Sequence, residues 1–539
     1  MKPETRVQNT TISLIILLGL LGGFIISFCT TWGPWAKSDS VEYLEAGLNM
    51  AAGHGLVLVE ATGAIIPLTI RPPFYSILLG IAGLGGIDLL DAARVIDVVL
   101  FITLILSLGF SISYFSSQPL LSIVASLFIV TSPIFIIIYT GVMSEPIFFS
   151  FGILGIFLLI GYLQEGHSLL LILSAVLVGL AWLARYAGIA FIATGLLSIV
   201  LFSHRSFKKR MGAVATYIFF SSALFLLWAY TISHAGGSPG EYEFEFNNLW
   251  GRLAPARVAL ANTTWEWLSF EALFPPVDYR TKRSILIGIA ILFFALSMYT
   301  IRKVKKNSQY QFLHNQCFQV ATIFTLFTII YTSFIAVTFL FVEEPRPAVT
   351  SRIFSPILIG ALISGLSFSN FAVETLILRK LLLAIPAGIV LFITASNIGQ
   401  SLELIADLHE NGLGYTSRQW RGSDVISAMY ELPDDVPLIS NDFAAIKFFT
   451  GRSAFGILEL EDHIRLDVFH AFGEDVSDEV QKIFREEGAA LVLFNRTLWK
   501  FQEIYSWNTA ARWAALIEGL YPYHEGLDGA IYFYQIPKP

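Results

Sequence analysis

The stretch SLLLILSAVLVGLAWLARYAGIAFIATGLLSIVLFSH, residues 168–204, decides the fold of this chain. Arg185 is its only Lys, Arg, Asp or Glu, and a single helix of this length would extend about 55 Å. The hydrocarbon core of a bilayer is about 30 Å thick, so one spanning helix cannot use the whole stretch. The sequence therefore predicts two membrane-spanning helices, 168–184 and 187–204, with a break near Arg185–Gly188.

Nine further apolar runs are long enough to span a bilayer. They are residues 11–33, 89–114, 118–139, 146–164, 212–234, 284–302, 316–341, 352–370 and 379–397. Of the 539 residues, 55% are hydrophobic and 14% are charged, against about 25% charged in an ordinary globular protein. This number of charged residues is too small to cover the surface of a soluble protein of this size. We therefore expect a polytopic all-α membrane domain. The net charge of −7 argues against nucleic acid as a partner.

The segment 73–87 is apolar but short and glycine-rich, and the charges of the loops decide whether it crosses the membrane. If it does not cross and the N-terminus lies inside, the basic loops 204–210 and 302–306 and the pair Arg379–Lys380 all lie inside, as the positive-inside rule requires. We therefore expect eleven spans in the cytoplasmic membrane and a re-entrant or interfacial helix at 73–87. The long acidic loops and everything after residue 397 then lie outside.

Residues 398–539 differ in pattern from the expected transmembrane domain, residues 1–397. We expect strands at Val436–Ser440, Ala489–Phe494 and Ala530–Ile536, and helices at 416–431, 442–450, 476–487 and 504–518. This alternation predicts an extracytoplasmic α/β domain with a partly parallel sheet. The chain has no glycine-rich nucleotide motif, so nucleotide binding is not supported.

The first outside loop, residues 34–88, is the most informative segment. Apolar residues at helical spacing from Val41 to Leu48 predict an amphipathic helix at the membrane surface, with Asp39 at its start. In one interpretation Asp39 caps this helix, because Asp39 and Glu42 have the spacing of a capping box. In the other, Asp39 is a carboxylate at the lipid–water boundary that takes a proton from a hydroxyl group.

Other polar residues stand at the outer ends of expected helices. Arg71, Arg185 and Arg352 are either interfacial anchors or a cluster that neutralises a phosphate, for which the guanidinium fork is well suited. Glu145 is either an acidic residue favoured by the helix dipole or a functional carboxylate at the rim of the bundle. The chain has no D-x-D and no zinc motif, and we expect no charged residue deep within a span.

These residues resemble, in the same order, the motifs of the GT-C superfamily of polytopic membrane glycosyltransferases, in the branch of protein O-mannosyltransferases and lipid A aminoarabinose transferases. The matching elements are Ser38-Asp39-Ser40-x-x-Tyr43 with Gly53-His54-Gly55, Arg71-Pro72-Pro73-Phe74-Tyr75, Ser144-Glu145-Pro146 and Arg352-Ile353-Phe354-Ser355-Pro356. The resemblance covers roughly residues 10–400. The chain departs from the pattern at Asp39, where many members have a second acidic residue beside the first.

The resemblance implies an enzyme of the cell envelope that transfers a sugar from a polyprenyl-phosphate-linked donor to an extracytoplasmic lipid, glycan or protein. Asp39 would be the general base of an inverting displacement, and Glu145 would orient the acceptor substrate or a divalent metal. The residues that would hold the lipid phosphate are Arg71, Tyr75, Arg185, Tyr186 and Arg352, and those of the acceptor loop are Tyr43 and His54.

Two other functions fit the same composition. A transporter or flippase of a lipid-linked saccharide would share the helix count, but it predicts internal symmetry and polar sites in mid-membrane, and neither is evident in the sequence. A ligase or polymerase of whole oligosaccharides would use the same membrane face and the same class of donor lipid. Only the resemblance favours transfer of a single sugar.

Overall fold

The computed structural model describes most of the chain. The described residues are 3–116, 118–203, 205–240, 243–247, 249–272, 276–306, 315–344, 350–375, 379–457, 480, 482–497 and 517–535. Their contacts divide the chain into two compact units. The helical unit is Met1–Thr30, Thr69–Leu78 and Asp91–His409, and the mixed unit is Thr31–Leu68, Leu79–Leu90 and Glu410–Pro539. The domain boundary expected between residues 397 and 398 stays a prediction.

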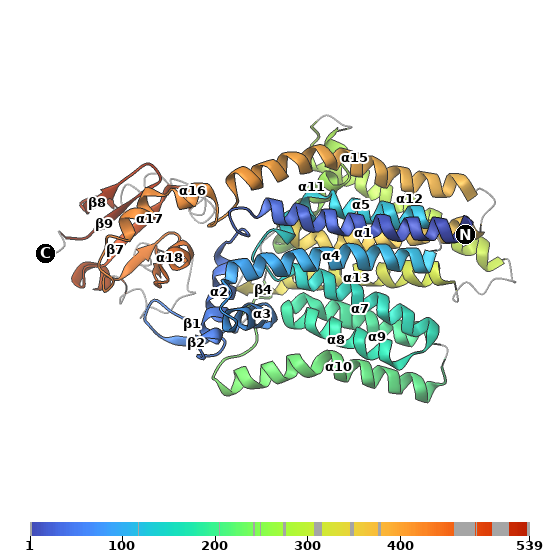
Figure 1. Cartoon of the computed structure of the whole chain (residues 1–539), viewed down its shortest axis with the longest axis horizontal. Coiled ribbons are helices and arrows are strands. Elements are labelled where there is room, and N and C mark those ends of the chain that lie inside the picture. The colour runs from blue at the N-terminus through green and yellow to red at the C-terminus, as the bar shows by residue number, and fades with distance from the viewer. Residues whose placement is uncertain are drawn as a thin grey trace. The chain divides into compact units, whose positions relative to one another are not determined.

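The helical unit consists of long helices that run side by side (Figure 1). They are α1 Pro3–Cys29, α4 Leu89–Ser116, α5 Pro119–Val130, α6 Pro133–Tyr139, α7 Glu145–Glu165, α8 Ser168–Ala184, α9 Ile189–Phe202, α10 Phe207–His234, α11 Leu249–Trp267, α12 Tyr279–Lys306, α13 Gln316–Phe341, α14 Ser351–Thr375 and α15 Arg379–Asn411. Short elements connect them: the 3-10 helices η1 Tyr186–Gly188 and η2 Phe270–Ala272, and the antiparallel pair β3 Glu243–Phe244 and β4 Val342–Glu344.

Each of the eleven expected spans overlaps a helix of the structure. Within the described residues, seven helices are long and apolar enough to cross a membrane, and the number is eight if α5 and α6, which meet at a bend of 61°, form one span. Shorter apolar helices are α3 Phe74–Leu84, α8 Ser168–Ala184 and the segment Tyr186–Phe202. The chain is therefore a multi-pass membrane protein, while the count of eleven spans and the interfacial helix at 73–87 stay predictions.

The break expected near Arg185 is confirmed. α8 ends at Ala184, Arg185 adopts an extended backbone conformation, and η1 leads into α9. Close packing of neighbouring helices accompanies this break: a Cβ on Gly152 of α7 would lie 2.1 Å from the Phe191 ring of α9. Small residues at such contacts let membrane helices approach closely, where apolar burial alone provides no driving force.

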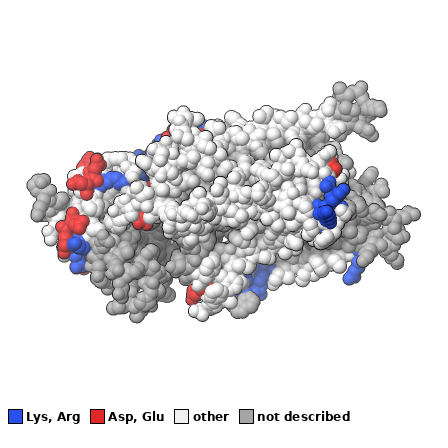
Figure 2. All heavy atoms as spheres, turned by 90° about the horizontal axis from the view of Figure 1, so that it is seen from below, with Lys and Arg blue, Asp and Glu red and all other residues white. Residues whose placement is uncertain are grey.

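Charged side chains are unevenly distributed over the surface. On the face shown in Figure 2, a broad stretch carries no described Lys, Arg, Asp or Glu, and the charged residues gather away from it. Exposed large apolar side chains such as Leu17, Phe24, Phe219 and Leu227 lie on helices of the helical unit. A surface of this kind is stable when lipid rather than water is the solvent.

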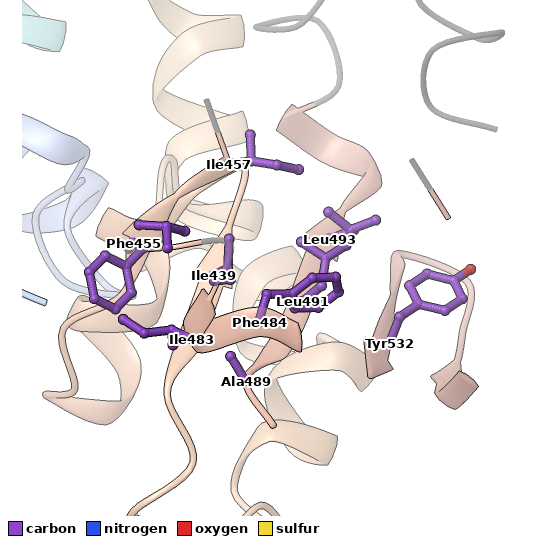
Figure 3. Close-up of a cluster of buried hydrophobic side chains, with 10 residues drawn as sticks. Ile439, Phe455, Ile457, Ile483, Phe484, Ala489, Leu491, Leu493 and Tyr532 are labelled. Atoms are coloured by element: carbon purple, nitrogen blue, oxygen red, sulfur yellow. The ribbon is translucent and has the colours of Figure 1, made fainter. Parts of the chain in front are cut away.

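The mixed unit contains a five-stranded sheet of order β6-β5-β7-β9-β8. Its strands are β5 Leu438–Ser440, β6 Phe455–Gly456, β7 Ala490–Phe494, β8 Tyr521–Glu525 and β9 Gly529–Phe533. Helices α16 Arg418–Arg421 and α17 Asp424–Met429 precede β5 in sequence, and α18 Phe443–Thr450 lies between β5 and β6. β5 pairs in parallel with β6 and β7, whereas β9 pairs antiparallel with β7 and β8. Figure 3 shows buried residues of its core, with Ile439, Leu491 and Leu493 close to Phe484.

Three strands of this sheet overlap the strands expected from the sequence, and β6 and β8 were not expected. The helical pattern 416–431 corresponds to α16 and α17, and 442–450 corresponds to α18. Most of the helix expected at 504–518, the start of the helix expected at 476–487, and Ile536 lie outside the described residues.

Residues 34–68 and 79–88 of the expected first outside loop belong to the mixed unit, and Thr69–Leu78 belong to the helical unit. The loop contains α2 Ser38–Ala51 and the hairpin of β1 Val57–Val59 and β2 Ile65–Pro67. The backbone N–H of Tyr415 donates to the carbonyl of Ala36 at 2.9 Å, and the hydroxyl of Thr416 donates to the carbonyl of Pro34 at 3.1 Å. The residues just before α2 are therefore joined to the start of the C-terminal segment.

Candidate functional site

Glu145 lies at the centre of a buried ionic cluster. It is the first residue of α7, after the N-cap Ser144, and its side chain is 5% exposed. Nη1 of Arg185 lies 2.8 Å from Oε2 of Glu145, and Nη1 of Arg352 lies 3.8 Å from Oε1. Arg185 also donates a hydrogen bond to the hydroxyl of Ser144. One carboxylate thus lies between two guanidinium groups that come from different helix ends.

A third guanidinium group, that of Arg71, interacts electrostatically with Glu145. The chain just before Arg71 is held by Tyr186, whose hydroxyl donates to the carbonyl of Thr69 at 2.8 Å. Tyr75, in the first turn of α3, is fully buried. We call Arg71, Glu145, Arg185 and Arg352 the Glu145 cluster.

The Glu145 cluster has more positive than negative charge, because three guanidinium groups face one carboxylate. Arginine forks of this kind bind planar or tetrahedral oxyanions with two parallel hydrogen bonds. A cavity of about 160 Å³ reaches Arg352, the one member of the cluster that lines it, and its other polar lining residues include Ser132, Glu266, Asn397 and Gln400. The cluster is therefore suited to an anionic group such as a phosphate.

Asp97 is a buried carboxyl group near this cluster that the sequence analysis did not identify. It lies in α4, about 12 Å along the helix axis from Leu89. The residue is fully buried, neither carboxyl oxygen has a hydrogen-bond partner within the described residues, and the group interacts electrostatically with Glu145. The expectation that no charged residue lies deep within a span is wrong, and the signal was an aspartate inside the apolar run 89–114.

Contacts one turn further along hold α4 against α6 and α7. The hydroxyl of Ser150 donates to the carbonyl of Leu100 at 2.8 Å and also shares a hydrogen bond of 3.0 Å with the hydroxyl of Tyr139. The rings of Phe101 and Tyr139 pack with centroids 4.7 Å apart. These contacts fix the helix that carries Asp97 relative to the one that begins at Glu145.

Asp39 lies in the first turn of α2, in the mixed unit, and is half-buried. The helix is capped by its neighbours instead: the backbone N–H of Lys37 donates to the hydroxyl of Ser40 at 3.0 Å. The capping box expected between Asp39 and Glu42 is therefore wrong. Lys37 and Ser40 form the capping box of this helix, and Asp39 stands in its first turn, where the helix dipole favours a carboxylate.

Tyr415 and Asp442 form a buried pair near Asp39. The hydroxyl of Tyr415 donates to Oδ1 of Asp442 at 2.7 Å. Burial raises the pKa of Tyr415 well above its usual range, and the carboxylates of Asp442 and Asp39 raise it further. Sequence patterns could not have identified this pair, because its members lie 27 residues apart and belong to no motif.

The two residues expected in the acceptor loop differ in their surroundings. Tyr43 is buried within α2, whereas His54 is exposed in the turn after it. Asp39 and His54 stand at opposite ends of a 14-residue helix, which is about 21 Å long. Asp39, Tyr43 and His54 belong to the mixed unit, and the remaining predicted site residues belong to the helical unit.

A metal site was left open by the sequence. Within the part of the chain that the structure describes, no group of three or more His, Cys, Asp or Glu side chains could hold a metal ion. The donors around Glu145 are cationic guanidinium groups, which repel a metal rather than bind it. The described residues therefore do not fit a resident divalent metal.

The fold of the chain is similar to that of a solved membrane oligosaccharyltransferase. The archaeal oligosaccharyltransferase AglB from Archaeoglobus fulgidus, solved with an inhibitory peptide and a dolichol-phosphate, aligns with 98% of this chain and 74% of its own at a TM-score of 0.52 and 12% identity. ArnT from Cupriavidus metallidurans, solved with undecaprenyl phosphate, aligns with 97% of this chain and 98% of its own at a TM-score of 0.48 and 11% identity. No protein-family model and no curated protein matches the sequence. The resemblance is thus confirmed at the level of the fold.

Proposed function

We propose that the protein is an integral-membrane glycosyltransferase that moves a sugar from a polyprenyl-phosphate-linked donor to a hydroxyl group of an extracytoplasmic acceptor substrate. The observation that carries the proposal is the Glu145 cluster, in which the buried carboxylate holds Arg185 at 2.8 Å and Arg352 at 3.8 Å. Such an arrangement suits the phosphate of a donor lipid. The dolichol-phosphate bound to the archaeal oligosaccharyltransferase, which has the same fold, supports a donor of this class.

The proposed reaction is an inverting displacement at the anomeric carbon. Asp39 accepts the proton of the acceptor hydroxyl as its oxygen attacks the anomeric carbon. The bond between that carbon and the phosphate oxygen breaks, and its electron pair leaves with the polyprenyl phosphate. Arg71, Arg185 and Arg352 stabilise the negative charge that develops on the leaving phosphate. No step is assigned to a metal.

Glu145 has a positioning role in this scheme. Its carboxylate fixes the orientation of two guanidinium groups before the donor arrives, so that less side-chain entropy is lost on binding. It also lowers the mutual repulsion of the arginines while leaving the cluster net positive. Tyr186 supports the segment that ends at Arg71 through its hydrogen bond to Thr69.

The test is transfer by the purified protein from a set of radiolabelled polyprenyl-phosphate sugars, with Asp39→Asn as the matched variant. We expect Asp39→Asn to lower turnover about a thousandfold, within the range of general-base contributions, with folding and donor binding unchanged. Near-normal turnover in this variant would remove the general-base role of Asp39. Movement of the intact donor between leaflets of proteoliposomes, with no bond broken, would support a flippase instead.

The donor series also separates two kinds of transfer. A monosaccharide donor that is consumed while an oligosaccharide donor is not supports transfer of a single sugar. The reverse preference would identify an oligosaccharide ligase or polymerase.

The proposal also places the C-terminal segment, residues 398–539, outside the cytoplasm. Protease added to intact protoplasts is expected to cleave this segment. Protection in intact cells and cleavage only after lysis would overturn the orientation and, with it, the extracytoplasmic acceptor.

A further inference from the structure

The mixed unit contains a cavity of about 1110 Å³. Its walls are α2, the β1–β2 hairpin, the segment 83–90, and the segments 434–437 and 447–453. All of these belong to the same compact unit. This volume is slightly larger than the roughly 300–1,000 Å³ of ordinary small-molecule sites, so the cavity has room for a large or extended ligand. Asp39 and the Glu145 cluster do not line it.

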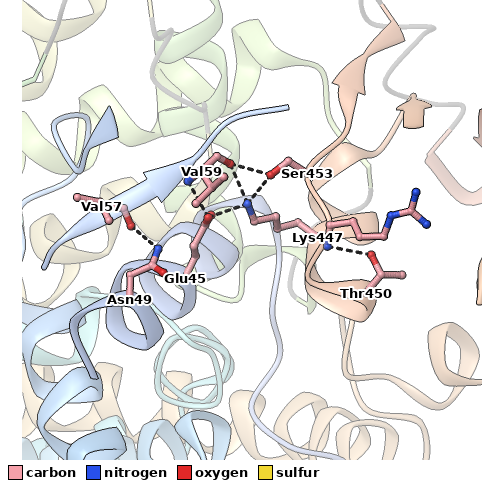
Figure 4. Close-up of polar contacts among 8 residues, drawn as sticks. Glu45, Asn49, Val57, Val59, Lys447, Thr450 and Ser453 are labelled. Atoms are coloured by element: carbon pink, nitrogen blue, oxygen red, sulfur yellow. Dashed lines mark hydrogen bonds and ion pairs between the residues drawn. The ribbon is translucent and has the colours of Figure 1, made fainter. Parts of the chain in front are cut away.

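A polar network joins the first outside loop to the C-terminal segment at this cavity (Figure 4). Lys447 pairs with Glu45 at 2.6 Å and donates hydrogen bonds to the carbonyl of Val59 at 2.8 Å and to the hydroxyl of Ser453 at 2.6 Å. Glu45 also accepts from the backbone N–H of Val59 at 2.8 Å. Asn49 donates to the carbonyl of Val57. The ammonium group of Lys447 is therefore fully engaged in structural contacts.

Three carboxylates of the lining, which we call the rim carboxylates, differ from Lys447 in this respect, whereas a fourth, Asp88, accepts a hydrogen bond from the backbone N–H of Leu90. Glu60, Asp434 and Asp435 are exposed, and their side chains make no hydrogen bond or ion pair within the described residues. Arg452, the other basic residue of the lining, donates to the backbone carbonyl of Val436. Ionised carboxylates only accept hydrogen bonds and repel anions, so the rim carboxylates favour a ligand that supplies donors and carries no negative charge.

Other residues of the lining are apolar. Leu48 of α2 is 56% exposed and Ile87 is 53% exposed, while Leu44 and Leu89 form the buried part of the wall. Phe448 contributes an aromatic ring. A ligand that covers this surface needs an apolar portion of its own, which would bury these side chains at about 25 cal/mol per Å².

We propose that this cavity binds an amphipathic molecule with a hydroxyl-rich, non-anionic head, and that this molecule is the acceptor substrate of the transfer. The head would donate hydrogen bonds to Glu60, Asp434 and Asp435, and the apolar part would lie against Leu48 and Ile87. This inference rests on the proposed function. Asp39 lies on the same helix, about 9 Å along the axis from Glu45, so an extended head can run along α2 toward the proposed base.

Photolabelling of the full-length protein in phosphatidylcholine nanodiscs tests binding separately from transfer. The probe is dodecyl glucoside with a diazirine in its alkyl chain, compared with dodecyl phosphate and dodecyltrimethylammonium that have the same modified chain. We expect the glucoside to label peptides from α2 and residues 83–90, and the phosphate to label them about tenfold less because of charge repulsion. Transfer activity can survive a failure of this binding experiment, so the two proposals fall separately.

Charge-neutralising variants test the role of the rim. Combining Glu60→Gln, Asp434→Asn and Asp435→Asn is expected to lower labelling by the glucoside about tenfold. A matched control removes the same charge from exposed carboxylates outside the cavity, with Glu431→Gln, Glu486→Gln and Glu487→Gln, and is expected to label like the unmodified protein.

Three outcomes would overturn the proposal. They are equal labelling by glucoside and phosphate, unchanged labelling in the rim variant, and stronger labelling by the trimethylammonium probe, which has charge but no hydrogen-bond donors. The proposal of a hydroxyl-rich ligand is supported if the glucoside labels the rim variant more weakly than the unmodified protein and labels the control variant equally well.

Discussion

The Glu145 cluster of the helical unit and the cavity of the mixed unit have opposite electrostatic character. The first offers guanidinium donors held by a buried carboxylate, whereas the second offers exposed carboxylates after its one ammonium group is paired with Glu45. The first suits a phosphate and the second suits a hydroxyl-rich group. Under the proposed function, this difference would keep a charged lipid donor and a neutral acceptor substrate from competing for one site.

Among the changes that test this comparison, the largest effect is expected from Arg185→Gln, which removes the guanidinium group closest to Glu145 and leaves Glu145 buried beside a neutral side chain. Breaking a buried ion pair lowers the free energy of unfolding by roughly 3–5 kcal/mol. Because the side chain of Arg185 is 29% exposed, we expect a loss of stability at the low end of this range. Donor affinity, measured by binding of radiolabelled polyprenyl phosphate, is expected to fall about a hundredfold. Arg257→Gln, at an exposed arginine of α11, is the control and should leave both quantities unchanged.

The second effect separates stability from phosphate binding within the Glu145 cluster. Combining Glu145→Gln with Arg185→Gln removes both charges, so neither is left buried without its partner. The double variant should therefore be about 2 kcal/mol more stable to unfolding than the summed losses of the two single variants predict. Donor affinity should stay low, because the guanidinium is still absent. Recovery of donor affinity along with stability would show that Arg185 does not contact the donor.

Asp97→Leu tests whether Asp97, the second buried carboxyl group near the Glu145 cluster, contributes to turnover. Asp97 is fully buried and its oxygens have no hydrogen-bond partner in the described residues, so an apolar side chain of similar size should raise stability by about 1–2 kcal/mol. We expect turnover to fall while thermal stability rises, as happens where a functional group is kept at a cost in stability. Asp97→Asn is the polar control. A less stable Asp97→Leu protein would contradict this interpretation.

The smallest effect concerns the mixed unit and its pH dependence. The pKa of Tyr415 is raised in the folded protein, mainly by burial, so the neutral phenol is favoured in the native state. Its stabilising effect is complete below the unfolded pKa of about 10 and is lost as the pH rises through the folded pKa. Tyr415→Phe should cost about 1 kcal/mol at neutral pH and flatten the loss of stability above pH 10. If Tyr415→Phe loses stability above pH 10 as steeply as the unmodified protein, groups other than Tyr415 cause the alkaline unfolding.

The membrane fold could be predicted from the sequence because its physical cause is local. The break at Arg185 follows from helix length against bilayer thickness, and α8 and α9 begin and end within three residues of the expected limits. The 61° bend between α5 and α6 was not expected. Pro133 follows Ser132 at that point, and proline there disfavours one continuous helix.

The site could be predicted only in part. Acidic and basic residues at helix ends identified Glu145 and its arginines, because the predicted topology places those positions on one membrane face. The cavity could not be found, because it requires residues from α2 and from the segment 434–453 to meet, which no local pattern encodes. Asp97 was overlooked because a hydropathy average over a long apolar run conceals one aspartate.

The joining of the first outside loop to the C-terminal segment determines how this protein can be recombined with its structural relatives. Tyr415 and Thr416 bind the backbone just before α2, and Lys447 binds the hairpin after it. A chimera that exchanges residues 410–539 alone would leave the helix bearing Asp39 without its partners. The smallest interchangeable piece therefore comprises two separate stretches of sequence, and homologous recombination with a single crossover cannot transfer it intact.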